Sequence, residues 1–269
     1  MDRKPYPSDV TDQEWALLEP LIPPAKSGGR DREVNMREIV NALFYVNRNG
    51  CAWRSLPHDL PPRSTVHGYF SQFCKDGTWE KINRVPGEQV RIQTGRSASP
   101  RAAIIDSQSV KTTEKGGLKG FDAHKMVTGR KRHIIVDMLG LLLLVKVQAA
   151  NVQDRDGARS LLQTLFWRHF HRLLVLFADG AYSGALVDWV KQELGWTLCI
   201  IRRLPGTKGF QVLPRRWIVE RTFAWLGGYR RLSKDYEYLP EHIYLAMIRL
   251  MLQRLTTTQK EVGTLALVA

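Results

Sequence analysis

The stretch RAAIIDSQS, residues 101–109, decides the fold of this chain, because helical periodicity gives way there to short apolar strands. Its apolar part, AAIID at residues 102–106, ends on an acid, as expected of a buried strand that reaches the edge of a sheet. The segments that follow predict a hairpin that turns at Leu139–Gly140 and then a further strand ending on an acid: RHIIVDMLG (132–140), LLLLVKVQAAN (141–151) and LLVLFADG (173–180).

Helical patterns alternate with these strands. A last strand is expected at Leu198–Arg202, and helices are expected at Asp156–His169, Gly184–Leu194, Pro214 to about Leu226 and Pro240–Leu255. Three sequential strands, followed by a helix, a parallel strand, a helix and another strand, predict an α/β fold. Its core is a mixed sheet flanked by helices.

The first eighty residues predict a small all-α region of the helix-turn-helix type. N-cap patterns at Thr11 and Asn35 open the first two helices. The third, Ser64–Cys74, repeats apolar residues at helical spacing and has a polar, basic other face that includes Arg63, Ser64 and His67. Three short helices of this kind suit a DNA reader. A plain helical bundle that only packs against the rest of the chain is the alternative.

The charge balance points to a polyanionic partner. Lysine and arginine number 40 against 26 acidic residues in 269, which gives a net charge of +14 and a pI near 9.9. Because the basic residues are interleaved with apolar runs and 8 tryptophans, they favour nucleic acid on a folded surface over a membrane-binding basic tail. A basic ribosome-associated protein is the alternative.

The cysteines and the hydropathy pattern favour a cytoplasmic protein without a membrane partner. Cys51, Cys74 and Cys199 are far apart, so they fit neither a disulfide framework nor a zinc knuckle. No apolar run follows the N-terminal charges, and the longest apolar stretch, Leu139–Val147, is too short to span a bilayer.

Three acids are candidates for chemistry. Asp106 and Asp179 end apolar strands, and ligands gather outside the carboxyl ends of strands in an open α/β sheet. Two converging carboxylates need a cation between them, and oxygen ligands alone select Mg²⁺ or Mn²⁺. Glu220 follows Arg216 by four residues, so both share one helical face. Each acid also has a structural interpretation, as a turn former or a surface ion pair; the three together favour metal-assisted phosphoryl transfer.

These motifs resemble the DDE transposases of bacterial insertion sequences, most closely the insertion sequence 5 family. The resemblance covers nearly the whole chain, in the family order. It is carried by GCAWRSLPHDLPPRSTVHGYFSQFCKDGTWE (50–80), IIDSQSVKTTEKGG (104–117), GRKRHIIVD (129–137), LFADGAYSG (176–184) and RRWIVERTFAWLGGYRRL (215–232).

The resemblance implies an RNase H-like catalytic fold with two Mg²⁺ (or Mn²⁺) ions on the triad Asp106, Asp179 and Glu220. It implies hydrolysis at the ends of a mobile element, followed by attack of the freed 3′-hydroxyl on target DNA. The partners implied are double-stranded DNA, as terminal inverted repeats and as target, and a homodimer or higher assembly on that DNA in the bacterial cytosol, associated with the nucleoid.

One departure from the family lies around the third acid. Related transposases carry a tyrosine and a lysine where this chain has Leu213 and Gly227. Arg230, Arg231 or Lys234 are the candidates to take over the missing phosphate contacts if the chain bends at Gly227–Gly228.

Further DNA contacts are expected from basic residues beside the catalytic strands and from the third N-terminal helix. The full expected set is Lys111, Lys125, Arg130, Lys131, Arg132, Arg216, Arg221, Arg230, Arg231, Lys234, Arg63, Ser64 and His67. The expected domains are a helical DNA-binding domain (1–80), a linker (81–100), an RNase H-like catalytic domain (101–257) and a C-terminal tail (258–269). Two alternatives stay open: a nuclease that cleaves without joining, and a DNA-binding inhibitor or inactive remnant.

Overall fold

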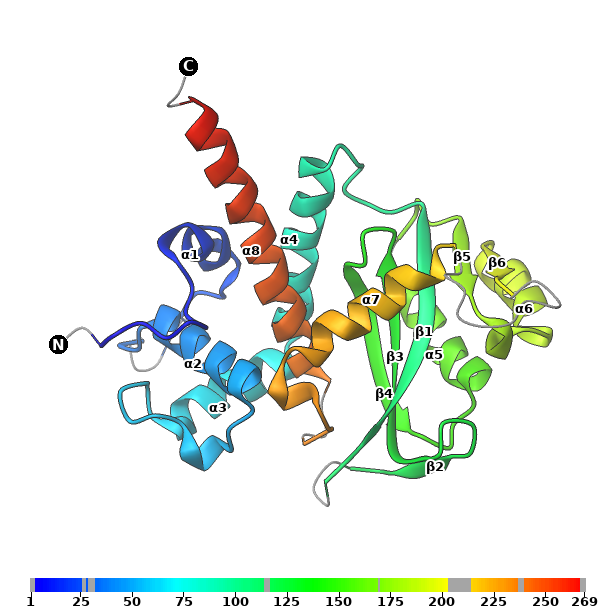
Figure 1. The fold of residues 1–269 in the computed structure, drawn as a ribbon, viewed down its shortest axis with the longest axis horizontal. Helices are drawn as coiled ribbons and strands as arrows, with labels where there is room; N and C mark the ends of the chain where they lie inside the picture. The colour runs from blue at the N-terminus through cyan, green and yellow to red at the C-terminus, as the bar shows by residue number, and fades with distance from the viewer. Residues whose placement is uncertain are drawn as a thin grey trace. The chain divides into compact units, whose positions relative to one another are not determined.

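The computed structural model describes residues 3–25, 28, 32–113, 117–168, 170–202, 214–236 and 240–266, with side chains up to residue 257 (Figure 1). The chain forms two compact units. The helical unit comprises Met1–Arg96, Gly228–Leu232 and Glu241–Ala269, and the sheet unit comprises Ser97–Gly227 and Ser233–Pro240.

Five α-helices make up the described part of the helical unit. They are α1 (Asp12–Leu18), α2 (Met36–Asn49), α3 (Arg63–Lys75), α4 (Thr78–Gln93) and α8 (Glu241–Ala266), with short 3₁₀ turns η1 (Glu19–Leu21), η2 (Trp53–Ser55) and η4 (Arg230–Leu232). The expected N-caps are confirmed. Thr11 and Glu14 form a reciprocal capping box on α1, and the Asn35 side chain accepts hydrogen bonds from the first turn of α2.

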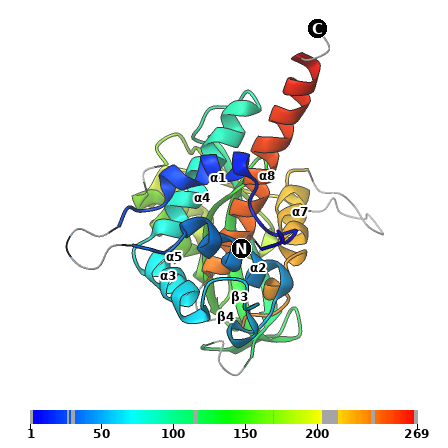
Figure 2. The ribbon, with the colours of Figure 1, turned by 90° about the vertical axis from the view of Figure 1, so that its left-hand side faces the viewer.

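The expected linker over residues 81–100 begins inside a helix. α4 continues to Gln93 through Pro86, and Trp79, Ile82 and Val90 are buried along one side of it. Pro86 interrupts the local helical pattern, yet the apolar positions before and after it still share one stripe. That stripe packs against α8, and both views show the two helices side by side (Figures 1 and 2).

α8 also differs from expectation. The sequence assigned its first half to the catalytic domain and residues 258–269 to a tail, whereas the helix runs to Ala266 and packs on α1, α2 and α4 of the helical unit. Buried Tyr244, Met247, Ile248 and Met251 form the apolar stripe that makes this contact.

The sheet unit is a six-stranded mixed sheet with helices. Its elements are β1 (Ala102–Lys111), β2 (Gly120–Asp122), β3 (Val127–Asp137), β4 (Leu142–Ala149), α5 (Asp154–Trp167), β5 (Val175–Ala178), η3 (Gly180–Tyr182), α6 (Ala185–Leu194), β6 (Thr197–Ile200) and α7 (Arg216–Gly227). β3 is antiparallel to β1, β2 and β4, while β5 is parallel to β1 and β6. This strand order confirms the predicted α/β, RNase H-like fold.

Helices cover the sheet on both faces. On one face, Ala103, Ile105, Ile135 and Leu144 pack in a core with α5 and α6, and α7 crosses the opposite face (Figure 1). The hairpin between β3 and β4 turns at Gly140, whose φ of 81° lies in the left-handed region. A Cβ there would lie 2.7 Å from Thr222 Oγ1 of α7, so this glycine lets α7 approach the turn closely.

Two further findings concern the whole described chain. Cys51, Cys74 and Cys199 are free thiols, as expected from their spacing. Within the described ranges, no helix has the length and apolar character needed to cross a membrane.

Candidate active site

Asp106 and Asp179 come together on neighbouring strands. The strand expected at residues 102–106 is longer than predicted: β1 continues to Lys111, so Asp106 lies in its middle, whereas Asp179 directly follows β5. In the parallel pairing of β1 with β5, Ile104 lies opposite Phe177, and each acid lies two residues farther along its strand direction. Because side chains alternate along extended chain, a step of two residues places both acids on the same face of the sheet. Asp179 itself remains extended and accepts a hydrogen bond from Ala181 N at 2.9 Å, which fixes its orientation.

The environment of Asp106 is that of a mostly buried acid beside another negative charge. Burial, together with the negative charge of nearby Asp179, raises the pKa of Asp106 to about 6. The hydrogen bond from Ser107 N–H to Asp106 Oδ1, at 2.7 Å, and the positive charges of Arg216 and Lys125 act in the opposite direction. The carboxylates of Asp106 and Asp179 therefore repel each other, and the side chains of Arg216 and Lys125 partly offset their negative charge.

Arg216 on α7 connects the second and third acids. Its Nη2 lies 3.7 Å from Asp179 Oδ2 and 3.3 Å from Glu220 Oε1. Glu220 follows Arg216 by one helical turn, and its side chain is 50% exposed. The predicted triad thus gathers around one guanidinium, with Asp106 and Asp179 from the sheet and Glu220 from a helix.

The donor set fits a hard divalent cation. All three acids offer carboxylate oxygen, and no histidine or cysteine is among them, which is the set that Mg²⁺ and Mn²⁺ prefer. Across the described residues no group of three histidine, cysteine, aspartate or glutamate side chains is arranged so that it could hold a metal ion. Asp106, Asp179 and Glu220 are nevertheless the residues that would hold such an ion.

A polar network behind Asp106 escaped the sequence analysis. The N-cap of α5 is Gln153, and the following Asp154 accepts a hydrogen bond at Oδ1 from Ser107 Oγ at 2.7 Å. Lys131 Nζ lies 3.0 Å from the same oxygen. Tyr182 is fully buried close to Asp106, Asp154 and Asp179, which raise the pKa of its hydroxyl beyond the effect of burial. The alternation of Ser107 and Ser109 after Ile105 indicates a polar face on this strand. The sequence does not show which residues of the neighbouring strand lie opposite them, because the register of β1 and β3 is not known from it.

Three expected DNA contacts in β3 are corrected by the structure. Arg130, Lys131 and Arg132 are 4%, 4% and 2% exposed, because β3 lies between β1 and β4 and both sheet faces are covered there. Arg132 donates to Asp235 through Nε (2.8 Å) and Nη2, and Lys131 pairs with Asp154 and Asp122. All three side chains are therefore buried, and Lys131 and Arg132 are paired with internal carboxylates.

Two other basic residues are also engaged within the protein. Arg231 is 6% exposed, donates to Cys51 O at 2.9 Å and lies over the Trp53 ring, all within the helical unit. The Arg221 guanidinium lies 4.5 Å from the rings of both Trp217 and Trp225 and donates to Leu139 O at 3.0 Å. The expected phosphate contact of buried Arg231 is therefore corrected, whereas Arg221 is half-buried and its expected contact stays a prediction.

The other expected contacts are exposed and stay predictions. They are Lys111, Lys125, Arg230, Lys234, Arg63, Ser64 and His67, of which Lys125 also donates to Ser107 O at 2.8 Å. Arg216 is half-buried among the acids. Gly227 ends α7, whereas Leu213 lies outside the described residues.

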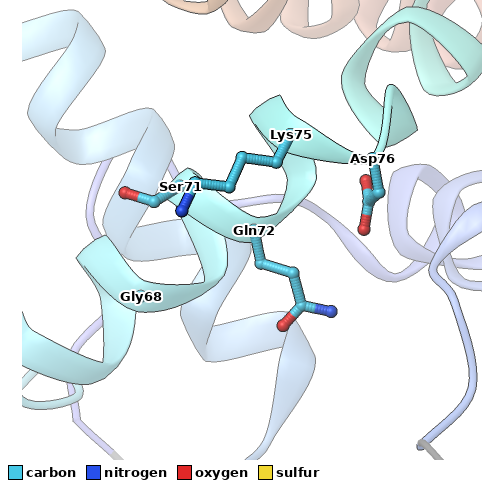
Figure 3. A pocket seen from close by; sticks show the side chains of 5 residues that line it. All are labelled: Gly68, Ser71, Gln72, Lys75 and Asp76. Carbon is cyan, nitrogen blue, oxygen red and sulfur yellow. The ribbon is translucent and has the colours of Figure 1, made fainter.

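The exposed side of α3 carries a hollow in addition to the expected residues. It is lined by Gly68, Ser71, Gln72, Lys75 and Asp76, and Figure 3 shows the Lys75 side chain directed back along the helix toward Ser71. Ser64, His67, Ser71 and Lys75 recur at intervals of three and four residues, so they share one helical face. This face is polar along the whole length of α3.

Solved structures of transposases are similar to this chain only at a low level. The Drosophila P element transposase strand transfer complex is 13% identical, covers 71% of this chain and 45% of its own, and has a TM-score of 0.32. The catalytic domain of Mos1 mariner transposase is 11% identical, with coverages of 65% and 89% and a TM-score of 0.27. Because these TM-scores are low, the RNase H-like fold is assigned from the strand order of the sheet.

Two curated relatives come from Burkholderia cepacia. The chain is 26% identical over 114 residues to "Insertion element IS402 uncharacterized 16.2 kDa protein", covering 40% of this chain and 76% of that protein. It is 30% identical over 115 residues to "Putative transposase for insertion sequence element IS402", covering 40% of this chain and 54% of that protein. The chain thus spans about half the length of the named transposase.

Family models match most of the chain. Residues 10–83 match "Putative transposase of IS4/5 family", and residues 97–252 match "Transposase DDE domain". The second match exceeds half of the 269 residues and contains Asp106, Asp179 and Glu220. This chain therefore belongs to the transposase DDE domain family, among the transposases of IS4/5-type insertion sequences.

Proposed function

We propose that this protein binds the terminal inverted repeats of an insertion sequence, cleaves DNA at the element ends and joins the freed 3′-hydroxyls to target DNA. The observation that carries the proposal is the convergence of Asp106 and Asp179 on adjacent strands, with Glu220 linked to Asp179 through Arg216. The assignment of these side chains to catalysis is part of the proposal.

The reaction needs charge stabilisation more than covalent chemistry, since phosphoryl transfer is driven by positioning and electrostatics. Two divalent ions bound by the three acids would activate the attacking oxygen and stabilise the leaving oxygen. Asp106 and Asp179, held by Ser107 N–H and Ala181 N–H, present preoriented carboxylates. Arg216 lies at the same place and would neutralise phosphate charge.

DNA would lie along exposed cations of the sheet unit and along α3. Lys111 and Lys125 are exposed near the catalytic strands, and Lys234 belongs to the same unit. On α3, the face with Ser64, His67 and the hollow beside Gln72 offers donors and acceptors that can read base edges. Because two element ends must be held at once, we expect a homodimer or larger assembly on DNA, at the bacterial nucleoid.

The test is cleavage and strand transfer on a labelled duplex that carries the element's terminal repeat, with Mg²⁺ or Mn²⁺. Wild type is compared with Asp106→Asn, Asp179→Asn and Glu220→Gln. Asp188→Asn, the same change at an exposed acid of α6, is the matched control. We expect the three active-site variants to bind DNA but neither cut nor join, while Asp188→Asn does both.

Other outcomes separate the alternative functions. Cleavage without joining would identify a nuclease. Specific binding of the repeat with no cleavage in either metal would identify an inhibitor or inactive remnant, which Leu213 and Gly227 favour because they replace two family residues. A ribosome-associated protein would show no preference for the repeat at raised salt.

A further inference from the structure

A buried polar patch lies directly behind Asp106. Odd-numbered residues of β1 face α5: Ile105 joins the apolar core there, but Ser107 and Ser109 follow it. The antiparallel register places Ser107 opposite His133 and Ser109 opposite Lys131 on β3. The apolar core therefore changes into a polar one at the level of the candidate catalytic acid.

Asp154, the first residue of α5, is at the centre of this patch. Its Oδ1 accepts from Ser107 Oγ at 2.7 Å and lies 3.0 Å from Lys131 Nζ. Lys131 also lies 3.3 Å from Asp122 Oδ2, and the Lys131 side chain is only 6% exposed. A buried lysine between two aspartates leaves Asp154 charged but compensated, and hence a strong acceptor for the serine.

The position of Asp154 depends on a close approach of α5 to the sheet. A Cβ on Gly157 would lie 2.5 Å from Cε1 and Nε2 of His133 and 2.8 Å from Gln148 Oε1. Only glycine therefore lets the first turn of α5 press onto β3 and β4 at this point. That contact brings the Asp154 carboxylate within reach of Ser107.

Ser107 transmits this contact to Asp106. Its N–H donates to Asp106 Oδ1 at 2.7 Å, and its carbonyl oxygen accepts from Lys125 Nζ at 2.8 Å. Lys125 Nζ also lies 3.1 Å from Ser107 Oγ. Ser107 is thus held at its hydroxyl by Asp154 and at its carbonyl by Lys125, while its N–H donates to Asp106.

We propose that Asp154, compensated by Lys131, is a positioning residue that sets the orientation of the Asp106 carboxylate through Ser107. This inference rests on the proposed function for its catalytic meaning. A buried ion pair of this kind contributes little net stability, because desolvation offsets the attraction. By contrast, the loss of a group that orients a metal-binding carboxylate strongly lowers metal affinity or activity.

Three variants separate positioning from folding. Asp154→Ala removes both the acceptor and the charge. Asp154→Asn removes the charge but keeps an oxygen that can accept from Ser107 Oγ, and it leaves Lys131 paired with Asp122. Asp156→Ala changes an exposed acid in the same helical turn and is the matched control. Ser107→Ala, which deletes only the hydroxyl, replaces Asp154→Ala if that variant does not fold.

Two measurements are made on each variant. Mn²⁺ titration without DNA reports the metal affinity of the acids, and cleavage of the labelled duplex reports kcat separately from DNA affinity. With Asp154→Ala or Ser107→Ala we expect Mn²⁺ affinity and kcat to fall about 10–100-fold, as for other outer-shell partners, with unchanged DNA affinity. Asp154→Asn should keep most of the wild-type Mn²⁺ affinity and kcat, and Asp156→Ala should lose nothing.

A spectroscopic measurement judges the positioning even if wild type proves inactive. In protein labelled with [¹⁵N]serine, the Ser107 amide proton should resonate downfield because it is bound to a carboxylate. Asp106→Asn and Asp154→Ala should both shift it, whereas Asp156→Ala should not. An unmoved Ser107 amide and wild-type Mn²⁺ affinity in folded Asp154→Ala would overturn the inference; absence of cleavage by wild type would overturn the proposed function instead.

Discussion

Removing Asp235 should destabilise the sheet unit by a large amount. Arg132 is 2% exposed and donates to Asp235 Oδ1 through both Nε and Nη2. Asp235 in turn donates its N–H to Lys111 O at 2.9 Å and so holds residues 233–236 against the end of β1. Asp235→Ala deletes the carboxylate that compensates a buried guanidinium, and breaking a buried pair in this way costs about 3–5 kcal/mol.

The assay is urea unfolding followed by circular dichroism, with Asp188→Ala as the exposed-acid control. A loss of about 3–5 kcal/mol corresponds to a melting temperature roughly 10 °C lower for a unit of this size. The double variant Asp235→Ala with Arg132→Leu removes both charges, so it should recover much of the loss. Wild-type stability in Asp235→Ala, or no recovery in the double variant, would refute the reasoning. Wild-type stability with lost DNA binding in Arg132→Leu would restore Arg132 as a DNA contact.

Three smaller perturbations test other parts of the structure. Thr11→Ala should cost about 1 kcal/mol in the helical unit, measured by urea unfolding, because it removes the capping box of α1. Gly140→Ala should cost roughly 1–3 kcal/mol, since its φ of 81° and the 2.7 Å approach to Thr222 Oγ1 both resist a side chain; Gly68→Ala, with open space around it, should not destabilise α3. Burial lowers the pKa of His133 in the folded protein to about 4, below its value near 6.5 in the unfolded chain. Between pH 6.5 and pH 4 the unfolded chain therefore binds a proton at this histidine that the folded protein does not bind. The free energy of unfolding should therefore fall as the pH falls through that range. His133→Gln should flatten that fall, and an unchanged pH dependence of the unfolding midpoint would contradict the assignment.

The strand pattern was sufficient to predict the two acids on the sheet. Apolar runs before Asp106 and Asp179 identify two strands that pair in parallel, although β1 continues past Asp106 to Lys111 and only Asp179 follows the end of its strand. The expected turn at Leu139–Gly140 is likewise confirmed, because glycine there meets a conformational requirement that is local in sequence. Local signals of this kind do not depend on how distant segments pair.

Features that depend on pairing could not be predicted. Because of Pro86, the sequence did not indicate that α4 continues to Gln93. The helix packs against α8, which lies more than 150 residues after Pro86 in the sequence. The contacts of Asp154 could not be predicted either, because nothing in the sequence around it indicates that Ser107 and Lys131 converge on it. A shift of one residue in the register of β1 and β3 would have moved both partners to the other face.

The basic run in β3 shows why charge alone misleads about DNA contacts. Lys131 faces α5, while Arg130 and Arg132 lie on the opposite face of the sheet. All three side chains are buried, because β3 has a neighbouring strand on each edge and both faces of the sheet are covered. Each such cation requires an internal partner, as Asp154 and Asp235 provide. DNA contacts of the sheet unit must therefore come from strand ends and connections, where Lys111 and Lys125 are exposed. If these lysines bind phosphates, replacing either should lower the slope of log K against log salt by about one, whereas replacing Lys131 should not change it.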